Sequence, residues 1–590
     1  MRSTALFITS LVLLAGSAAA QDVEEFHRRA DETLQRFLLD FWRQDLGYLE
    51  HEHPGASGPT GYWTFAQGFD ALLDGVERTD GSRYGGLIET FYAAQDARGW
   101  IVSHYDDEAW MALALIRAHD LTGEQRYLDR AVSLYTDIER AWDETCCGSN
   151  PGGIWWDKAH TQKATASNAA PVILAVRLHE RTGVAARLAF ARKVYEHWME
   201  EMVNPSTFQV TDHIEPNGTK VFWRFTYNEG LMVGASVELH LATGDAVYLQ
   251  NAHRFASFIL GSETKPSRFG SVLHDGTASQ CGGDCHMFKG PAYRYLLLLQ
   301  ETSPRSSYAG LLSASANALW TLARSEDGLF GVDWTGPPPA SSTEPQAAAA
   351  VMALNLHARI RGPFPDGFDP LLEAEEAAIR GVGLEATHGA FTGWGYVAGW
   401  NGDGQSVTFA FDAAAAGIHD MTFRHAGGAG AASRRISVNG SVIAANLAFP
   451  GTGSWASYDE VSLPANLRAG RNTIEVAFSA SAGNGNFLNL DHLRVRSRAP
   501  IFLRGDANSD GGVDLSDAIA VLLHLFAGRS LECLAAGDAD GGGSLAITDA
   551  VRILDLLFRS GPALPDPYPE CGAAPPSGAG CEAYSPCWPP

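Results

Sequence analysis

The chain has 590 residues, which at roughly 100–200 residues per domain predicts about three to five domains. Its apolar content of 45% excludes a wholly disordered chain, and its net charge of −25 repels phosphate backbones and argues against a nucleic-acid partner. The 15 Trp fit carbohydrate binding, because sugar rings stack their C–H faces on indole, although most Trp are expected in the core.

Residues 1–20 are predicted to be a signal peptide. Arg2 precedes an apolar run over 5–14 that is too short to span a bilayer, and small residues at 18–20 suit cleavage before Gln21. No later run is long enough for a membrane span, so we expect a secreted or cell-surface-attached monomer. Export permits disulfides, and three pairings are possible within each of two groups: Cys146, Cys147, Cys281 and Cys285, then Cys533, Cys571, Cys581 and Cys587.

Helical periodicity dominates residues 21–362. Thr-Gly pairs at 122–123, 182–183 and 243–244 mark an internal repeat, and each Gly suits the position just past a helix end. Paired helices bury their apolar faces only by stacking, so six pairs would close into an (α/α)6 barrel, with an open superhelix as the alternative. The expected helices cover 24–43, 62–78, 84–97, 106–120, 125–141, 163–181, 185–202, 227–242, 246–260, 288–302, 306–324 and 344–360.

The pattern changes after a predicted linker at 363–370. Short alternating segments predict an all-β sandwich, jelly-roll-like, over 371–498, with a hairpin turn at Asn439-Gly440. Two loop-plus-helix units follow over 501–562, forming a small α domain. The Pro- and Cys-rich tail 563–590 is expected to be irregular and tied by disulfides. The expected strands cover 407–411, 421–424, 435–438, 473–476 and 493–495.

Three consecutive acids, Asp106, Asp107 and Glu108, open one predicted helix. Such acids can simply complement the helix dipole and cap free N–H groups. Glycoside hydrolysis instead needs two carboxyl groups across one bond, one ionised and one protonated. Adjacent carboxyls can do this because like-charge repulsion separates their titrations, and their spacing allows the ~5–5.5 Å of a retaining enzyme.

The segment 105–114 closely resembles glycoside hydrolase family 76. Matching segments follow in order at 152–157, 163, 168, 225–230, 288–296, 333–334 and 346, so the resemblance covers about 25–360. It implies an (α/α)6 barrel and a retaining endo-α-1,6-mannanase that cleaves mannan without a cofactor. It also implies that Asp106 is the nucleophile and Asp107 the acid/base. Met111 and Glu229 depart from the family pattern, which has Trp and Gln there.

Several residues of these segments are candidates for sugar contacts, with packing inside the barrel or, for Asp157, helix capping as the alternative. They are Trp155, Trp156, Asp157, Tyr227, Asn228 and Lys289. Two other functions stay open: a barrel enzyme acting on uronide polysaccharides, and a catalytically silent mannan-binding or scaffold protein. Cys281, Cys285 and His286 could ligate zinc, but in an exported chain we expect disulfides that bridge this loop to the Cys146–Cys147 loop.

Three acids of the sandwich are candidate calcium ligands. Glu373 and Glu375 lie two apart on an expected strand, and Asp491 joins them if the first and last strands pair. Such a cluster needs a cation, for which Ca²⁺ is suited, unless the three are solvated surface acids. The segment resembles carbohydrate-binding modules of families 6 and 35, which implies structural Ca²⁺ at these acids and sugar contact by Tyr396, Trp455 and Asn489.

Residues 506–517 follow EF-hand spacing, with Gly at loop position 6 and oxygen ligands at positions 1, 3, 5, 9 and 12. A second copy starting at Asp538 has lost two ligands, at Gly542 and Ala546, so we expect weak binding or none. The duplicated unit resembles a dockerin, which implies a cohesin-type partner. Attachment to the cell surface and a purely structural role are the alternatives. The Ca²⁺ ligands expected in the first loop are Asp506, Asn508, Asp510, Asp514 and Asp517.

Overall fold

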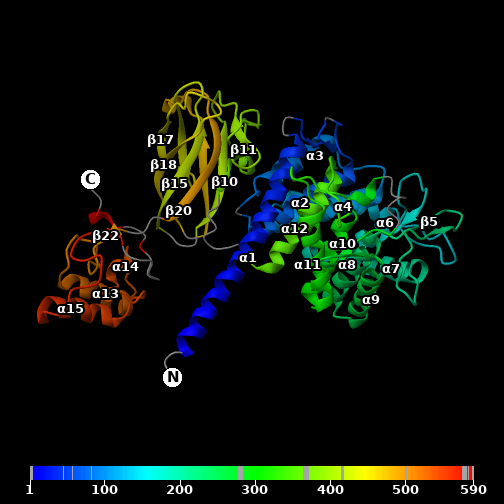
Figure 1. Cartoon of the computed structure of the whole chain (residues 1–590), viewed down its shortest axis with the longest axis horizontal. Helices are drawn as coiled ribbons and strands as arrows, with labels where there is room; N and C mark the ends of the chain where they lie inside the picture. The colour runs from blue at the N-terminus through cyan, green and yellow to red at the C-terminus, as the bar shows by residue number, and fades with distance from the viewer. Residues whose placement is uncertain are drawn as a thin grey trace. The chain divides into compact units, whose positions relative to one another are not determined.

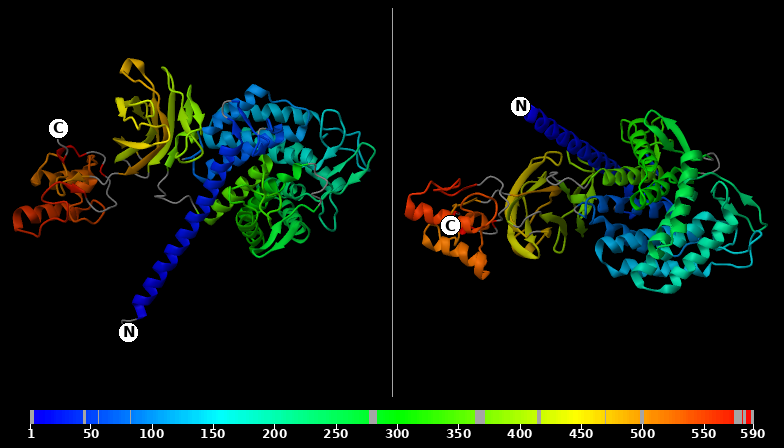
Figure 2. Two further views of the ribbon diagram at one scale, coloured as in Figure 1. Left: turned by 45° about the horizontal axis from the view of Figure 1, so that its top comes forward. Right: turned by 90° about the horizontal axis from the view of Figure 1, so that it is seen from below.

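The computed structural model describes residues 4–590 except 44–45, 56, 82, 277–282, 363–370, 414–416, 469, 498–500, 574–580, 582–583 and 588–590. The chain divides into two compact units, Met1–Phe368 and Asp369–Pro590 (Figures 1 and 2). The predicted linker lies outside the described residues. Within the described ranges, no helix is both long and apolar enough to cross a membrane.

Twelve α-helices form the described part of the first unit, close to the predicted ranges. They are α1 (Thr4–Phe41), α2 (Tyr62–Arg78), α3 (Leu87–Arg98), α4 (Tyr105–Thr122), α5 (Gln125–Arg140), α6 (Thr165–Thr182), α7 (Ala185–Met202), α8 (Thr226–Thr243), α9 (Ala246–Ser262), α10 (Lys289–Thr302), α11 (Ser306–Leu322) and α12 (Glu344–Arg361). The first helix begins at Thr4 and not near residue 24, so it runs without a break through the predicted signal peptide. Cleavage before Gln21 stays a prediction.

The even-numbered helices form an inner ring. Each of α2, α4, α6, α8, α10 and α12 packs on the next, and α12 returns to pack on α2, while odd-numbered helices lie outside them. The inner helices are buried along most of their length because both faces are covered. This ring of helix pairs is consistent with the predicted (α/α)6 barrel and excludes an open superhelix.

The Thr-Gly repeat ends three inner helices in the predicted way. Gly123, Gly183 and Gly244 all adopt a left-handed conformation, with φ of 73°, 69° and 73°, just after α4, α6 and α8. A residue with a Cβ pays a steric cost there, whereas Gly does not. Each Gly thereby stops an inner helix and starts the turn into its outer partner.

Short strands tie the loops at the N-terminal ends of the inner helices. The pairs are β1 (Trp42–Arg43) with β2 (Tyr48–Leu49), β3 (Glu52–His53) with β9 (Ser342–Thr343), β7 (Thr264–Ser267) with β8 (Gly270–Leu273), and the three-stranded β4 (Lys163–Ala164), β5 (His213–Ile214) and β6 (Lys220–Val221). The β3–β9 pair joins segments nearly 300 residues apart in the chain, beside the point where the ring closes.

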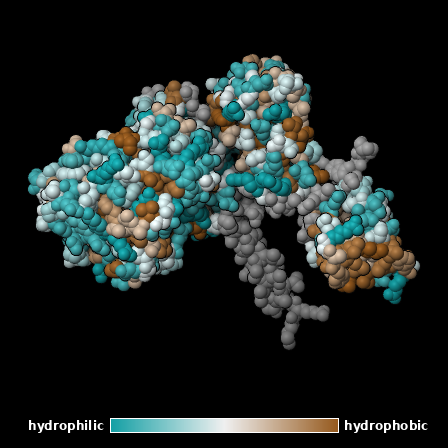
Figure 3. Space-filling view, turned by 180° about the vertical axis from the view of Figure 1, so that it is seen from behind, coloured by the Kyte–Doolittle hydropathy of each residue, from teal (hydrophilic) through white to brown (hydrophobic). Residues whose placement is uncertain are grey.

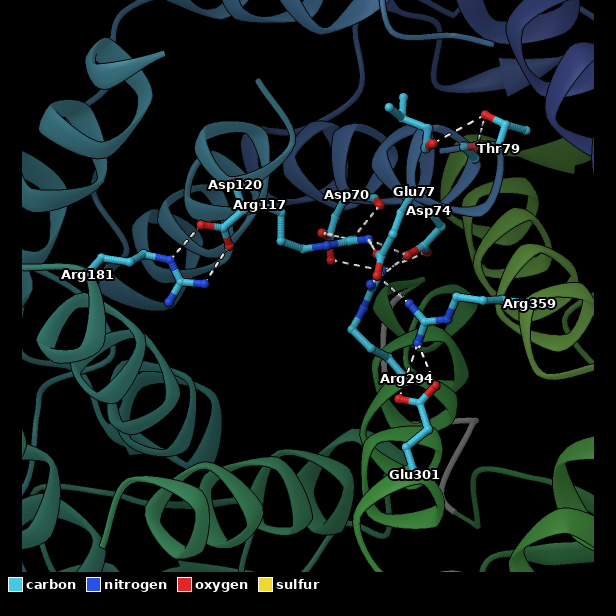
Figure 4. Close-up of polar contacts among 12 residues, drawn as sticks. Asp70, Asp74, Glu77, Thr79, Arg117, Asp120, Arg181, Arg294, Glu301 and Arg359 are labelled. Atoms are coloured by element: carbon cyan, nitrogen blue, oxygen red, sulfur yellow. Dashed lines mark hydrogen bonds and ion pairs between the residues drawn. The ribbon is translucent and has the colours of Figure 1, made fainter. Parts of the chain in front are cut away.

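Ion pairs, most of them buried, tie four of the inner helices together (Figure 4). Asp74 of α2 accepts hydrogen bonds from Arg117 of α4 at 2.7 Å and from both terminal nitrogens of Arg294 of α10 at 2.7 and 2.8 Å. Asp70 contacts the same two arginines. Glu77 adds Arg359 of α12, so residues from four helices meet at this end of the ring.

The second unit begins with a β-sandwich of two sheets. One has the order β12-β13-β20-β15-β18 with β10 also on β20, and the other has the order β11-β14-β19-β16-β17. Their bounds are β10 (Leu371–Glu373), β11 (Ala378–Arg380), β12 (Gly383–Glu385), β13 (Tyr396–Ala398), β14 (Ser406–Ala413), β15 (Gly417–Ala426), β16 (Ala432–Val438), β17 (Ser441–Phe449), β18 (Asp459–Leu467), β19 (Gly470–Ala477) and β20 (Asn489–Ser497). Apolar residues of both sheets form one core between them.

One local prediction for the sandwich is confirmed, and the condition for its acid cluster is met. Asn439 and Gly440 connect β16 to β17 with positive φ at both residues, which a two-residue hairpin turn requires. The first strand, β10, pairs with the last strand, β20, and places Glu373 opposite His492.

The C-terminal segment contains α13 (Leu515–Ala527), α14 (Leu534–Gly537) and α15 (Ile547–Arg559), and α13 packs on α15. Two disulfides, Cys533–Cys581 and Cys571–Cys587, join the tail to this segment and to itself. The tail also pairs β22 (Gly572–Ala573) with β21 (Ile501–Phe502). The predicted disulfide-tied tail is therefore confirmed for its described residues.

Candidate active site

A pocket of about 580 Å³ opens at the N-terminal ends of the inner helices. It is lined by Asp106 and Asp107 at the start of α4 and by aromatic side chains from α2, α4, α8 and the intervening loops. The lining residues are Trp63, His104, Asp106, Asp107, Trp110, Trp156, Gln162, Ala164, Ala166, Asp212, His213, Trp223, Phe225, Tyr227, Asp284, Phe288 and Pro291.

The three acids that open α4 have separate roles. Asp106 and Asp107 are half-buried and line the pocket. Glu108 is fully buried and accepts hydrogen bonds from the backbone N–H of Val102 at 3.0 Å and from Lys158 Nζ at 3.1 Å. Glu108 is therefore held in the interior by the loop before α4 and by Lys158, whereas the two aspartates face the pocket.

Burial raises the pKa of both aspartates, but their hydrogen bonds and neighbouring charges differ. Burial raises the pKa of Asp106 to about 7, while hydrogen bonds from Trp156 Nε1, at 3.0 Å, and from backbone N–H groups counteract it. Burial raises the pKa of Asp107 further above its ordinary value, and the charges of Asp106, Asp284 and Glu108 add to that rise. The Trp156 hydrogen bond thus favours the ionised form of Asp106, whereas the neighbouring carboxyl groups favour the protonated form of Asp107.

Two of the predicted sugar contacts lie in the pocket. The Trp156 indole donates to Asp106 Oδ2 and packs against His104, with ring centroids 4.5 Å apart. Tyr227 lies against Phe288 at 4.2 Å, and its hydroxyl donates to Asp212 Oδ2 at 3.3 Å. Both rings thus border the space beside Asp106 and Asp107.

The other four predicted contacts are not among the residues that line the described pocket, and their contact with a sugar stays a prediction. Trp155 is buried against His160 and beneath Lys163. Asp157 folds its own loop by accepting from Thr161 at 2.8 and 2.7 Å. Asn228 Nδ2 donates to Asp212 Oδ2 at 3.0 Å, and Lys289 Nζ donates to buried Asp275 at 2.9 Å. Asn228 therefore acts on the pocket by holding Asp212.

Sequence reasoning missed several pocket residues, notably Asp212, His213 and Asp284. Asp212 accepts from His213 Nδ1 at 2.7 Å and from Asn228, and the His213 ring lies beside Trp223. All three residues come from connections that precede inner helices. Their polarity was an available signal, but nothing in the local pattern separated them from other polar loop residues.

The two departures from the family pattern lie outside the pocket lining of the described chain. Met111 is fully buried within the ring. Glu229 is buried and accepts from the backbone N–H of Val210 at 2.7 Å. Neither side chain therefore supports the silent-protein alternative.

The predicted loop-to-loop disulfide is wrong. Cys146 bonds to its neighbour Cys147, and Cys285 is also disulfide-bonded, which removes the thiolates that a zinc site would need. The Cys146–Cys147 loop is held instead by the buried Lys163 ammonium. This group donates to the carbonyl oxygens of Cys146 and of Gly152 and to Asp143 Oδ2, the last two at 2.7 and 3.0 Å.

The sandwich gathers most of its predicted cation ligands. Glu373, Asp491 and His492 have ligand atoms within 4.8 Å of one another. Glu375 lies in a short 3₁₀ helix, Ala374–Glu376, so the expectation that it shares a strand with Glu373 is wrong. Its Oε1 accepts from the N–H groups of Trp394 and Gly395, while buried Oε2 has no hydrogen-bond partner.

The predicted sugar contacts of the sandwich separate by exposure. Tyr396 is fully buried and its hydroxyl contacts Thr387 at 3.0 Å, which leaves no free ring face for a sugar; its predicted sugar contact stays untested. Asn489 is buried in β20. Trp455 is half-exposed and its ring lies over Gly428, where a Cβ would come within 2.5 Å of it.

The two C-terminal loops repeat the same hydrogen bonds at an offset of 32 residues. Asp506 accepts from the N–H groups of Asp510 and Gly511, as Asp538 does from Gly542 and Gly543. In the first loop, several predicted ligands are engaged locally: Asn508 Nδ2 donates to Asp510, and Asp514 caps α13 through Ser516. Asp517 accepts from the N–H groups of Asn508 and Asp514.

The second loop also brings acids together. The ligand atoms of Asp538, Asp540 and Asp549 lie within 4.8 Å of one another. Asp549 accepts from the N–H groups of Asp540 and Ala546, matching Asp517 in the first loop. The weaker loop expected from sequence is thus as closely organised as the first.

Comparison with protein families decides the identity of the barrel. The model described as "Glycosyl hydrolase family 76" matches residues 26–364, more than half of the chain. The chain belongs to glycosyl hydrolase family 76. The model of carbohydrate-binding module family 35 matches residues 371–497, so a family 35 module follows the glycosyl hydrolase domain. The resemblance to family 6 stays a prediction.

Curated relatives include two proteins named mannan endo-1,6-alpha-mannosidase DCW1. The one from Candida glabrata is 26% identical over 291 residues, 44% of this chain and 62% of its own length. The one from Eremothecium gossypii is 25% identical over 339 residues, 51% of this chain and 72% of its own. An isomaltosyltransferase of Sporosarcina globispora is 33% identical over 123 residues, 21% of this chain but only 11% of its own length.

Solved structures of the family share the fold. The GH76A alpha-1,6-mannanase from Salegentibacter has a TM-score of 0.51 and 26% identity, and it covers 56% of this chain and 99% of its own. An inactive variant of that enzyme, with two consecutive aspartates replaced by asparagine, is in complex with alpha-1,6-mannotriose; it has a TM-score of 0.51 at 25% identity and covers 56% of this chain and 99% of its own. The Lin0763 protein from Listeria innocua has a TM-score of 0.53 at 26% identity and covers 57% and 97%.

Proposed function

We propose that this protein is a secreted, retaining endo-glycosidase that hydrolyses α-1,6-mannosidic linkages in mannan backbones. The observation that carries the proposal is the placement of Asp106 and Asp107 side by side in the lining of one aromatic pocket. They form the only Asp-Asp pair of the sequence. The consecutive aspartates replaced in the inactive Salegentibacter variant, and its bound α-1,6-mannotriose, support the same chemistry and substrate here.

The charges of the pocket favour a neutral sugar. Four carboxyl groups line it, from Asp106, Asp107, Asp212 and Asp284, and no Lys or Arg is among the described lining residues. A uronate carboxylate entering this space would meet like charges without a compensating cation. Hydroxyl groups, by contrast, can donate to carboxylates while the sugar faces stack on Trp156 and Tyr227. The pocket therefore disfavours the uronide alternative.

Catalysis then uses the unequal acidities of the pair. Ionised Asp106, stabilised by the Trp156 indole and the start of α4, attacks the anomeric carbon. Asp107 gives its proton to the departing glycosidic oxygen, leaving a covalent mannosyl–Asp106 ester. Asp107, now ionised, takes a proton from water as that water displaces Asp106. The product keeps the α configuration, and both carboxyl groups return to their starting states.

The test uses linear α-1,6-mannan and counts new reducing ends, with product stereochemistry followed by NMR. Asp106→Asn and Asp107→Asn should each lower kcat by orders of magnitude while the thermal transition is kept. Asp120→Asn, at the other end of α4, is the matched control and should leave turnover unchanged. Full activity in either pocket variant, or an inverted product, would refute the assignment; a uronide product would support the rival enzyme.

We also propose that Ca²⁺ stabilises the family 35 module. Glu375 is buried with an unpartnered carboxyl oxygen, and burial together with the charge of Glu373 raises its pKa well above 4.5. Glu373, Glu375 and Asp491 would hold the cation, whose positive charge would let all three ionise. The half-exposed Trp455 is the aromatic residue best placed to contact a polysaccharide in this module.

We further propose that residues 501–562 attach the enzyme to a cohesin-type protein partner. Apolar side chains between 48% and 74% exposed lie on α13 and recur 32 residues later on α15, on the brown surface of the C-terminal segment in Figure 3. Apolar side chains that are exposed singly are normal on a protein surface, whereas a group of them on one surface is typical of a protein-binding site. Its members are Leu515, Ile519, Phe526, Ile547, Val551 and Phe558. The loops at the start of both helices would hold Ca²⁺.

A further inference from the structure

Asp284 brings a third carboxyl group close to the catalytic pair, from a different part of the chain. It begins a short 3₁₀ helix, Asp284–His286, directly before α10, whereas Asp106 and Asp107 begin α4. In the inner ring, α6 and α8 separate α4 from α10 on one side, and α2 and α12 on the other. Asp284 therefore faces the pair across the mouth of the ring, and all three carboxyl groups line the same pocket.

The backbone on either side of Asp284 is held, although its own side chain is exposed to the pocket. The next residue, Cys285, is buried and disulfide-bonded. His286 Nδ1 lies 3.0 Å from Thr343 Oγ1 at the start of α12. The carboxyl itself accepts a hydrogen bond from the Trp63 indole of α2. A carboxylate positioned in this way binds a ligand with little further loss of freedom.

No charge in the pocket neutralises this group. The described lining holds no Lys or Arg, and besides aromatic rings it offers only other carboxyl groups, the amide of Gln162 and the imidazoles of His104 and His213. The Asp284 carboxylate is accessible, has no cation beside it in the described lining and lies opposite the reacting groups. The groups of a neutral sugar that can bind such a carboxylate are its hydroxyls, which donate hydrogen bonds to it. Charge-assisted hydrogen bonds of this kind are stronger than neutral ones.

We propose that Asp284 is a substrate-positioning residue, which accepts hydrogen bonds from the hydroxyls of a sugar ring held between it and Asp106–Asp107. The inference rests on the proposed function, since that function supplies the sugar. It has an electrostatic consequence as well. The negative charge of Asp284 raises the pKa of both Asp106 and Asp107, so it helps Asp107 keep the proton that the leaving group needs.

The pH dependence of activity reports on this charge, because the titratable groups around the pair are known. Asp106 and Glu108 neighbour Asp107 on its own helix, and Glu108 is paired with Lys158. The other titratable groups of the pocket lining are His104 at the helix start and Asp212, His213, Tyr227 and Asp284. Removing the Asp284 charge lowers the pKa of Asp107. The alkaline limb of kcat/KM should therefore move to lower pH.

The experiment measures kcat and KM against pH on α-1,6-mannotetraose, for wild type and Asp284→Asn. The variant keeps the shape of the side chain but loses its charge. We expect KM to rise by about 10-fold or more, since a hydrogen bond to a charged group is lost, and the alkaline limb to shift to lower pH. Asp327→Asn, which removes an exposed carboxylate outside the lining, is the control and should change neither quantity.

A binding measurement separates this inference from the proposed function. Calorimetry measures the binding of mannotetraose to two proteins: the Asp106→Asn/Asp107→Asn variant, and the same variant with Asp284→Asn added. The thermal transition of the triple variant shows whether it folds. Weaker binding by the variant with Asp284→Asn supports the inference. If the wild-type protein does not cleave mannan, that result overturns the proposed function but not this inference. Unchanged KM, pH limb and binding would overturn the inference. If Asp284→Asn does not fold, Trp63→Phe replaces it, because this change removes the hydrogen bond that holds the Asp284 carboxyl. We then expect KM to rise, and an unchanged KM in Trp63→Phe would overturn the inference.

Discussion

Removing Asp74 tests whether the ion pairs at the C-terminal end of the inner ring hold the barrel together. The Asp74 side chain is fully buried and accepts three charge-assisted hydrogen bonds from Arg117 and Arg294. Asp74→Ala leaves both guanidinium groups in place, with Asp70 as their remaining shared partner. Breaking a buried pair from one side costs about 3–5 kcal/mol, because a buried charge loses its compensation.

The size of the expected melting shift follows from the size of the barrel. Unfolding entropy is about 2.1 cal/mol/K per residue, so residues 21–362 contribute about 0.7 kcal/mol/K, and a loss of 3–5 kcal/mol lowers Tm by about 4–7 °C. Scanning calorimetry of the full chain measures this shift in the barrel transition. Activity at low temperature should be kept, because Asp74 lies at the end of the ring away from the pocket.

The matched control is Glu301→Ala, which removes a partner of Arg359 from the same cluster. This pair is solvent-exposed, with 44% of the Glu301 side chain accessible, so its loss should cost at most about 1 kcal/mol and lower Tm by roughly 1 °C. Equal shifts for the two variants, or no shift for Asp74→Ala, would refute the reasoning that burial of these charges makes their pairing indispensable.

Three further predictions concern the site and the two accessory parts. Trp156→Phe removes a hydrogen bond that lowers the pKa of Asp106, so the acid limb of kcat/KM should move to higher pH; an unmoved limb would mean that the indole does not stabilise the ionised carboxylate. Without Ca²⁺ the module should lose stability as pH rises above 4.5, because the folded-state pKa of Glu375 is raised, and Ca²⁺ at ~100 times its Kd should add about 2.7 kcal/mol at neutral pH; a calcium-independent transition contradicts the site. Phe526→Asp combined with Phe558→Asp should abolish binding to a cohesin module measured by calorimetry while the barrel stays active, and binding that survives both changes would contradict the docking face.

Much of the architecture could be predicted because it depends on local patterns. Apolar spacing of 3.6 residues places a buried stripe on each helix wherever that helix ends up, and the Thr-Gly pairs stop helices through a backbone conformation that Gly alone adopts without strain. The Asn439-Gly440 turn is local for the same reason. These features depend only on residues close together in the chain, so they can be predicted from the sequence without the fold.

The pairing of the cysteines and the choice of side chains that line the pocket depend on residues far apart in the chain. Cys146 could reach several partners along the chain, and only the loop folded around Lys163 leaves it bonded to its neighbour. Trp155 and Trp156 are adjacent and chemically identical, yet one packs into the core and the other into the pocket. Their opposite directions follow from the path of the loop, which distant helices determine.

The sequence by itself determined the helix pairs, the switch to strands and the family to which the chain belongs, since each is encoded in residues close together in the chain. Only the tertiary structure decided which of the three consecutive acids face the pocket. Successive side chains of a helix point about 100° apart, so closing the ring turned Glu108 inward and left Asp106 and Asp107 in the pocket. The same closure brought Asp284 within electrostatic reach of them, nearly 180 residues along the chain.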